Sequence, residues 1–250
     1  MGPVLRRTSD LWVFPTIVLV TGAAAAFCAG ATTGAAAGPW IFVTVFGGWV
    51  ITLCLHEFAH AVVSLAGGDT SVRERGYLWL NPVRYSDATT SLVIPLVLLA
   101  VGGIPLPGGA VVVEPYRLRR RWWASLVSAA GPVTNLLLGI ALVLVAVRLD
   151  SFLGTALAFL GLLQFVAGVL NLLPVPGFDG FGILTPYLSG AFLQKIRPLQ
   201  PWLPLAVFAI LFSVPGAGSA LFDIGRWLTD ALGGSTFQAD IGGSLFRFWQ

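Results

Sequence analysis

Charged side chains are scarce in this 250-residue sequence. Only 10% of its residues are Asp, Glu, Lys or Arg, whereas 56% are hydrophobic. A soluble domain carries about 25% charged residues, so the composition excludes a soluble globular protein and predicts a chain that lies mainly in lipid. The net charge of +3 does not indicate a nucleic-acid partner, because most basic residues gather in a few short loops, as is usual for membrane proteins.

Cysteine and histidine are also rare, with two of each. Cys28 and Cys54 lie in apolar stretches, where a free cysteine behaves as a small hydrophobic residue, so no disulfide framework is expected. With only His56 and His60, a metal site built from three imidazoles is excluded. We find no internal repeat, low-complexity tail or appended soluble domain. The first apolar stretch is much longer than the apolar core of a signal peptide, which has roughly 7–15 residues, so a signal peptide is not expected here.

Long charge-free runs fill most of the sequence. About 20 apolar residues cross a bilayer as a helix, and several runs reach that length. We therefore predict an all-α polytopic membrane protein with about five transmembrane helices. The predicted spans are residues 11–37, 40–65, 123–147, 151–173 and 199–214, with a turn at Gly38–Pro39 between the first two.

Two further segments do not match a straight span. Residues 88–113 are apolar but interrupted by several prolines and glycines, and irregular backbone at membrane depth is tolerated where protein or a wet cavity covers it. We predict a re-entrant hairpin here, which could include short β-strands near residues 103–113 that pair with an extended partner chain. Residues 220–250 are amphipathic and are expected at the membrane interface.

Basic residues predict the orientation of the chain. If the N-terminus is cytoplasmic and the 88–113 hairpin returns to the side it came from, eleven basic residues face inward and three face outward. This distribution agrees with the positive-inside rule. The outward three are Arg148 and, if the tail is external, Arg226 and Arg247.

The stretch LCLHEFAH, residues 53–60, places both histidines and one acidic residue inside the second predicted span. Positions i and i+4 of a helix share a face, so His56 and His60 can bind one Zn²⁺ while Glu57 lies beside it as general base. Ionisable groups within a span are costly and are functional by default. The pattern therefore predicts a catalytic zinc site.

A catalytic zinc ion takes three protein ligands and keeps one position for water, and the third ligand here must be a carboxylate or Cys54. Asp179 follows the broken end of the fourth predicted span on the inner side, whereas Glu114 adjoins a cluster of arginines and Asp150 lies on the far side. Asp179 is favoured, with Cys54 and Glu114 as alternatives. This choice also requires the hairpin, because a crossing by residues 88–113 would place Asp179 about 30 Å from the histidines.

Asn135 lies 12 residues into the third predicted span, roughly 18 Å deep and close to the depth of His56. A buried amide in lipid needs a partner. It forms either a helix–helix hydrogen bond or a donor to the oxyanion of a reacting carbonyl. Asn171, in the fourth predicted span, has the same two interpretations.

Three motifs occur in this order along the chain: HEFAH (56–60), AGPVTN (130–135) and NLLPVPGFDG (171–180). With them, residues 40–180 resemble the site-2 protease family of intramembrane zinc metalloproteases. The sequence departs from the family at Phe178, where leucine is frequent, and it shows no PDZ or CBS domain.

The resemblance implies one membrane-embedded protease domain over residues 1–250, with a catalytic core at 40–180, a substrate-side re-entrant segment at 88–113 and an interfacial tail at 220–250. It also implies one Zn²⁺ per chain bound by His56, His60 and Asp179, with Glu57 activating the water. Asn135 is a further catalytic candidate.

The expected activity is that of a zinc metalloendopeptidase that cleaves within or near transmembrane segments, in regulated intramembrane proteolysis. Its substrate would be a transmembrane protein such as a membrane-tethered transcriptional regulator, and its setting a bacterial cell membrane, with the active site toward the cytoplasm. One alternative is a metal or proton transporter that uses the same His, Glu and Asp residues, although no inverted repeat is visible. The other is an inactive scaffold, which the intact Glu57 argues against.

Overall fold

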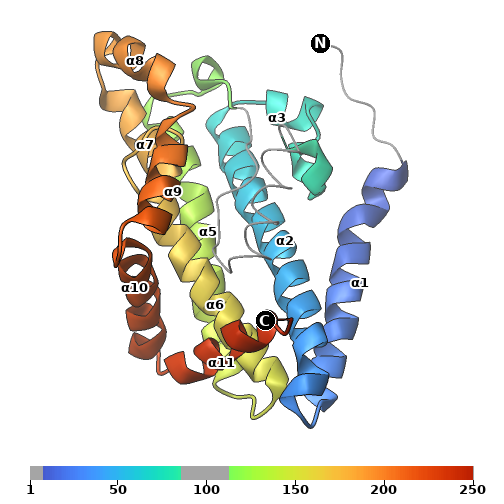
Figure 1. Ribbon diagram of the computed structural model, residues 1–250. Helices are drawn as coiled ribbons and strands as arrows, with labels where there is room; N and C mark the ends of the chain where they lie inside the picture. Colours follow the sequence, from blue (N-terminus) through green and yellow to red (C-terminus); the bar gives the residue numbers. More distant parts are fainter. Residues whose placement is uncertain (1–7, 86–112, 250) are drawn as a thin grey trace.

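The computed structural model describes residues 8–85 and 113–249, and every secondary-structure element within these two ranges is helical. The prediction of an all-α polytopic protein is confirmed (Figure 1). Residues 88–112 of the predicted hairpin lie outside the described ranges, and the strands expected near its end lie there too, apart from residue 113. The helices are α1 (Thr8–Gly30), α2 (Gly34–Gly67), α3 (Ser71–Glu74), α5 (Trp122–Ala146), α6 (Phe152–Asn171), α7 (Asp179–Leu184), α8 (Gly190–Ile196), α9 (Leu203–Ser213), α10 (Ala217–Ala231) and α11 (Thr236–Phe246). Short 3-10 turns are η1 (Tyr77–Trp79), η2 (Pro82–Arg84), η4 (Pro115–Arg117), η5 (Thr185–Tyr187) and η6 (Arg197–Leu199).

Within residues 8–85 and 113–249, four helices are long and apolar enough to cross a membrane: α1, α2, α5 and α6. The turn between the first two lies at residues 31–33, so its prediction at Gly38–Pro39 was wrong. Thr33 begins α2 because its side chain accepts a hydrogen bond from the first turn of the helix, at 3.3 Å. Gly38 serves packing instead, since a Cβ added to it would lie 2.6 Å from Phe248.

The fifth predicted span, residues 199–214, is also not a single straight helix. Its main helix, α9, has 11 residues, and at 1.5 Å per residue it covers about 16 Å, roughly half of the hydrocarbon core. It reaches spanning length only together with Gly190–Leu199, and the two parts are bent by 58°. Proline at positions 198, 201 and 204 explains the bend, because it cannot donate to the helix ladder and clashes with the preceding turn.

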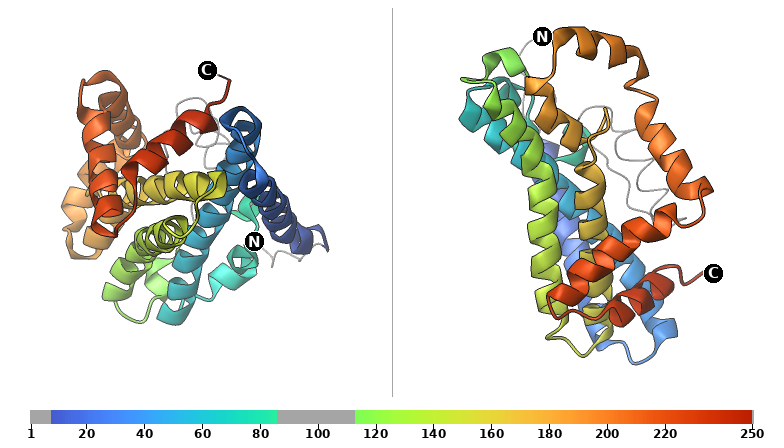
Figure 2. Two further views of the ribbon diagram at one scale, coloured as in Figure 1. Left: turned by 90° about the horizontal axis from the view of Figure 1, so that it is seen from below. Right: turned by 90° about the vertical axis from the view of Figure 1, so that its left-hand side faces the viewer.

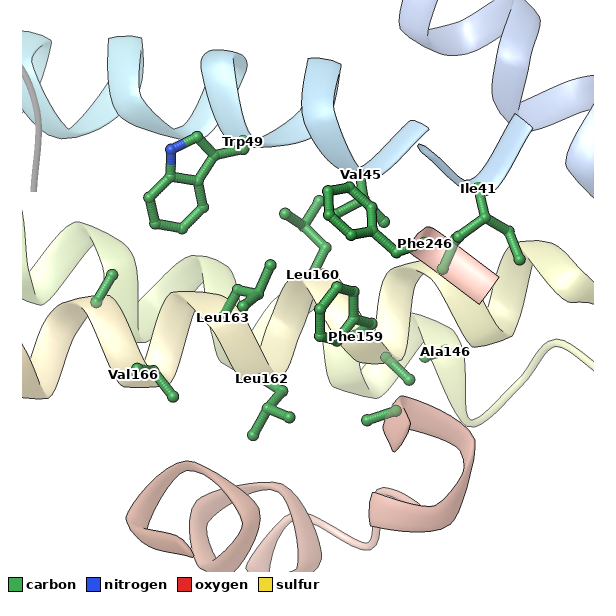
Figure 3. Close-up of a cluster of buried hydrophobic side chains, with 14 of the residues drawn as sticks. Ile41, Val45, Trp49, Ala146, Phe159, Leu160, Leu162, Leu163, Val166 and Phe246 are labelled. Atoms are coloured by element: carbon green, nitrogen blue, oxygen red, sulfur yellow. The ribbon is translucent and has the colours of Figure 1, made fainter. Parts of the chain in front are cut away.

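Helix α6 lies at the centre of the molecule. In its most apolar window 83% of the residues are buried by protein, against 11% for α1. It is surrounded by α2, α5, α10 and α11 (Figure 2). Figure 3 shows the resulting core, in which Trp49 and Val45 of α2 face Leu160 and Leu163 of α6. Because α6 is packed on most sides, the segment that follows it begins at a fixed depth in the bundle.

The C-terminal helices close one end of the bundle. Phe246 of α11 is fully buried in the core of Figure 3, and Gln238 donates a hydrogen bond to the Leu149 carbonyl in the α5–α6 turn at 3.5 Å. The tail therefore lies at the end that holds the α1–α2 and α5–α6 turns, opposite the end where Gly67 completes α2 (Figure 1). Among the described residues, three basic side chains share this end: Arg148, Arg226 and Arg247.

Candidate metal centre

Helix α2 presents His56, Glu57 and His60 to the interior, and all three are buried. The two histidines are one helical turn apart, so their rings lie on one face with centroids 4.7 Å apart. Their Nε2 atoms are separated by 3.1 Å.

Asp179 completes a cluster with these rings. Its Oδ2 lies 3.3 Å from Nε2 of His56, and its Oδ1 lies 3.4 Å from Nε2 of His60. Ligand atoms from the three residues all lie within 4.8 Å of one another. The structure thus brings together the three predicted ligands, although 119 positions of sequence separate His60 from Asp179.

Packing of α7 against the ends of α5 and α6 places Asp179, the first residue of α7. A side chain at Gly180 would overlap the Leu172 carbonyl just after α6, so only glycine lets α7 rest there. The Ser125 hydroxyl of α5 donates to the Ile183 carbonyl of α7 at 2.7 Å and holds the helix from its other side.

Both imidazoles are oriented through their Nδ1 atoms by acceptors on α5. Nδ1 of His56 lies 3.1 Å from Oδ1 of Asn135, and Nδ1 of His60 lies 2.6 Å from the carbonyl oxygen of Val127. An oxygen acceptor requires the proton on Nδ1, so the neutral ring keeps its lone pair on Nε2, the nitrogen that faces Asp179.

The spacing of the three donors fits zinc. Two imidazole lone pairs face each other at 3.1 Å, and each faces one of the two Asp179 oxygens at 3.3–3.4 Å, an arrangement that a proton or a metal cation between the groups stabilises. Ligands at about 2.0–2.1 Å from a tetrahedral zinc ion are roughly 3.3 Å apart from each other. Two histidines and a carboxylate are also a donor set of catalytic zinc sites, in which the fourth position is left to water.

Comparison with known proteins agrees with this geometry. The chain is 42% identical over 250 residues to a protein of Mycobacterium tuberculosis that is named as a zinc metalloprotease, Rip2, and the match covers 97% of this chain and 95% of the relative. The chain belongs to the site-2 protease family. The protein named Rip2 in Mycolicibacterium smegmatis is 38% identical over 247 residues, with the same coverage. YwhC of Bacillus subtilis, also named as a zinc metalloprotease, is 28% identical over 194 residues, which is 71% of this chain and 81% of YwhC. No family model and no solved structure matches the chain.

One residue of this site-2 protease was not assigned from the sequence. Gly131 of α5 faces the metal centre, and a Cβ there would overlap the Nε2 atoms of both His56 and His60. The glycine therefore leaves the space between the rings and α5 open. The sequence feature that could have indicated this role is the position of Gly131 in an apolar span, within the AGPVTN motif. Glycine in a membrane-spanning helix is typical of close helix approach.

The other candidates lie outside the cluster. Cys54 is buried two residues before His56 on α2, and its carbonyl accepts a hydrogen bond from Tyr85 at 3.1 Å. Glu114 forms ion pairs with Arg75 and Arg117 at the Gly67 end of the bundle. Asn135 of α5 forms a hydrogen bond with His56 of α2. This is the helix–helix hydrogen bond, the first of the two interpretations given for Asn135. The role of Asn171, buried at the end of α6, stays a prediction.

Proposed function

We propose that this site-2 protease is a zinc metalloendopeptidase that hydrolyses peptide bonds within or near transmembrane segments. The observation that carries the proposal is the convergence of His56 and His60 of α2 with Asp179 of α7, in a bundle of membrane-spanning helices in which Glu57 is also buried. The names of the relatives, which cover most of the chain, support the same activity. A transporter has no such support.

His56, His60 and Asp179 would hold the zinc ion. When bound, zinc polarises the scissile carbonyl and lowers the pKa of a water molecule toward about 7. Glu57 takes the proton from the attacking water and returns it to the departing nitrogen. Asn135 keeps His56 in its binding tautomer through Oδ1, and its amide group supplies a donor for the developing oxyanion.

The charge distribution supports an active site toward the cytoplasm. The bundle end nearer the histidines carries the arginine-rich loops, and His56 lies 11 residues before Gly67, about 16 Å below that end of α2. The opposite end carries fewer basic residues, three arginines among those described, and the positive-inside rule assigns the end with fewer basic residues to the outer face. A fragment cleaved at this depth would leave to the cytoplasm, which suits release of a membrane-tethered regulator in a bacterial cell.

Glu57→Gln tests the proposed chemistry. The variant loses the general base but keeps all three ligands, so cleavage of a model transmembrane peptide by the purified chain should fall about 10²–10⁴-fold. Its zinc content, measured by mass spectrometry of the metal, should equal that of the wild type. Undiminished cleavage would refute the mechanism. Zinc uptake into proteoliposomes without any cleavage would instead support the transporter.

A further inference from the structure

A cavity of about 320 Å³ lies between α6, α10 and α11, at the bundle end opposite the metal centre. Each helix lines it with residues three, four or seven positions apart, which lie on one face of a helix. The side chains that matter are apolar Phe159, Leu162 and Phe222 and charged Arg226, Asp240 and Arg247. The cavity therefore has an apolar wall and a charged rim. Figure 3 shows Leu162 pointing from α6 toward the C-terminal helices.

The two arginines of the rim are paired differently. Arg226 bridges Asp223 on its own helix at 3.2 Å and Asp240 on α11 at 3.0 Å. Arg247 donates through Nε to the Gly243 carbonyl at 3.4 Å and forms no ion pair with any residue in the described ranges 8–85 and 113–249. Asp223 and Asp240 hold both terminal nitrogens of Arg226, so the guanidinium whose outer NH₂ groups can bind an anion is that of Arg247.

Exposed aromatic side chains mark the membrane level of this cavity. Trp227 is 67% exposed and Phe237 is 75% exposed, and Phe248 and Trp249, which follow α11, are exposed as well. Aromatic residues gather where the hydrocarbon core meets the headgroups. An anion held at this level, above an apolar wall, has the make-up of a lipid: a phosphate group followed by acyl chains.

We propose that this cavity binds a phospholipid, with Arg247 on the headgroup phosphate and an acyl chain along Phe159, Leu162 and Phe222. Guanidinium groups bind phosphate oxygens in pairs and are less strongly hydrated than ammonium groups. The site is separate from the metal centre and does not depend on proteolysis.

Binding of phosphatidylglycerol to the purified full chain in detergent, followed by native mass spectrometry, tests the proposal. Arg247→Gln should weaken binding about ten-fold, which corresponds to 1.4 kcal/mol. Arg148→Gln is the matched control, because it removes an exposed arginine from the same end of the bundle outside the cavity, and it should bind like the wild type.

One further measurement uses the wild type alone, so it does not depend on folding of a variant. Inorganic phosphate at the same concentration should not displace the lipid. Equal binding by wild type and Arg247→Gln, or displacement by free phosphate, would overturn the proposal.

Discussion

The two histidines of the metal centre are held by acceptors of different kinds. His56 bonds to a side chain, that of Asn135, whereas His60 bonds to a backbone carbonyl, that of Val127. Partners that orient a metal-binding histidine typically change metal affinity about 10–100-fold. Substitution can remove the first of these bonds but leaves the second in place, because every residue at position 127 supplies the same carbonyl.

Asp179→Asn should cost most of the bound zinc. Asparagine keeps the shape of the side chain but removes the charge that partly neutralises the metal, so zinc affinity should fall by more than about 100-fold, beyond the loss expected for a residue that only orients a ligand. Zinc content after dialysis against a mild chelator measures this. Asp150→Asn, an exposed aspartate at the other end, is the control. Full zinc retention in Asp179→Asn would show that the third ligand lies elsewhere.

Gly131→Ala should disturb the same site from the side of α5. The added methyl group overlaps both Nε2 atoms, so the rings must rotate away from Asp179, and zinc affinity and peptide cleavage should each fall by about ten-fold or more. Gly22→Ala makes the identical change where no atom lies within 4 Å, and both properties should be preserved in it. The interpretation is wrong if the two variants behave alike.

Among the elements, the segment after α2 and the residue before η4 are joined by one buried carboxylate, that of Asp69. Oδ1 of Asp69 accepts hydrogen bonds from the Ser71 hydroxyl at 2.6 Å and the Ser71 amide at 3.0 Å, and Oδ2 accepts from the Glu114 amide at 2.9 Å. Burial alone would raise the pKa of Asp69, but these bonds outweigh it and hold the pKa below its usual range. The ionised form is thereby part of the fold.

The stability contributed by Asp69 should depend on pH. Because its pKa is lower in the folded chain, the contribution is present above the unfolded value of about 3.9 and is lost as the pH falls through the folded value. Asp69→Asn places an NH₂ group against a donor and should destabilise the protein by about 1–3 kcal/mol at neutral pH. Thermal unfolding in detergent at a series of pH values measures both effects. A variant as stable as the wild type at neutral pH would contradict the assignment.

At the scale of the whole molecule, the helices differ greatly in how much protein surrounds them. Helix α6 is enclosed on nearly all sides, while α1 contacts mainly α2 and exposes most of its surface. The two ends of the bundle differ as well, since one carries α7 and α8 and the other carries α11. If the charge distribution sets the orientation, these ends face opposite sides of the membrane.

Labelling of single cysteines tests that orientation. In a background without Cys28 and Cys54, Ala191→Cys on α8 should react with a membrane-impermeant maleimide only from the cytoplasmic side. Ala231→Cys, at the end of α10, should react only from the outer side. Both positions are exposed, so access to the reagent is comparable. Reaction of both from one side would refute the arrangement.

The sequence by itself determined what can be read from neighbouring positions. Composition and run length predicted the all-α membrane class and the approximate positions of four spans, because about 20 apolar residues are needed to cross lipid wherever they stand. The spacing of His56 and His60 predicted that their rings share a face, because helical periodicity is local. The turn at residues 31–33 was missed because Gly38–Pro39 has turn-forming residues, and only packing against Phe248 explains that glycine.

Only the tertiary structure decided what depends on contacts between distant segments. It decided among the three candidate third ligands by bringing Asp179, the one favoured from the sequence, to the histidines; it also placed the Val127 carbonyl on His60 and set Gly131 against both rings. It also decided which end of the bundle the C-terminal helices cover. A backbone carbonyl has no residue-specific signal, and a contact across more than a hundred positions depends on how α5, α6 and α7 pack together, which no local pattern in the sequence records.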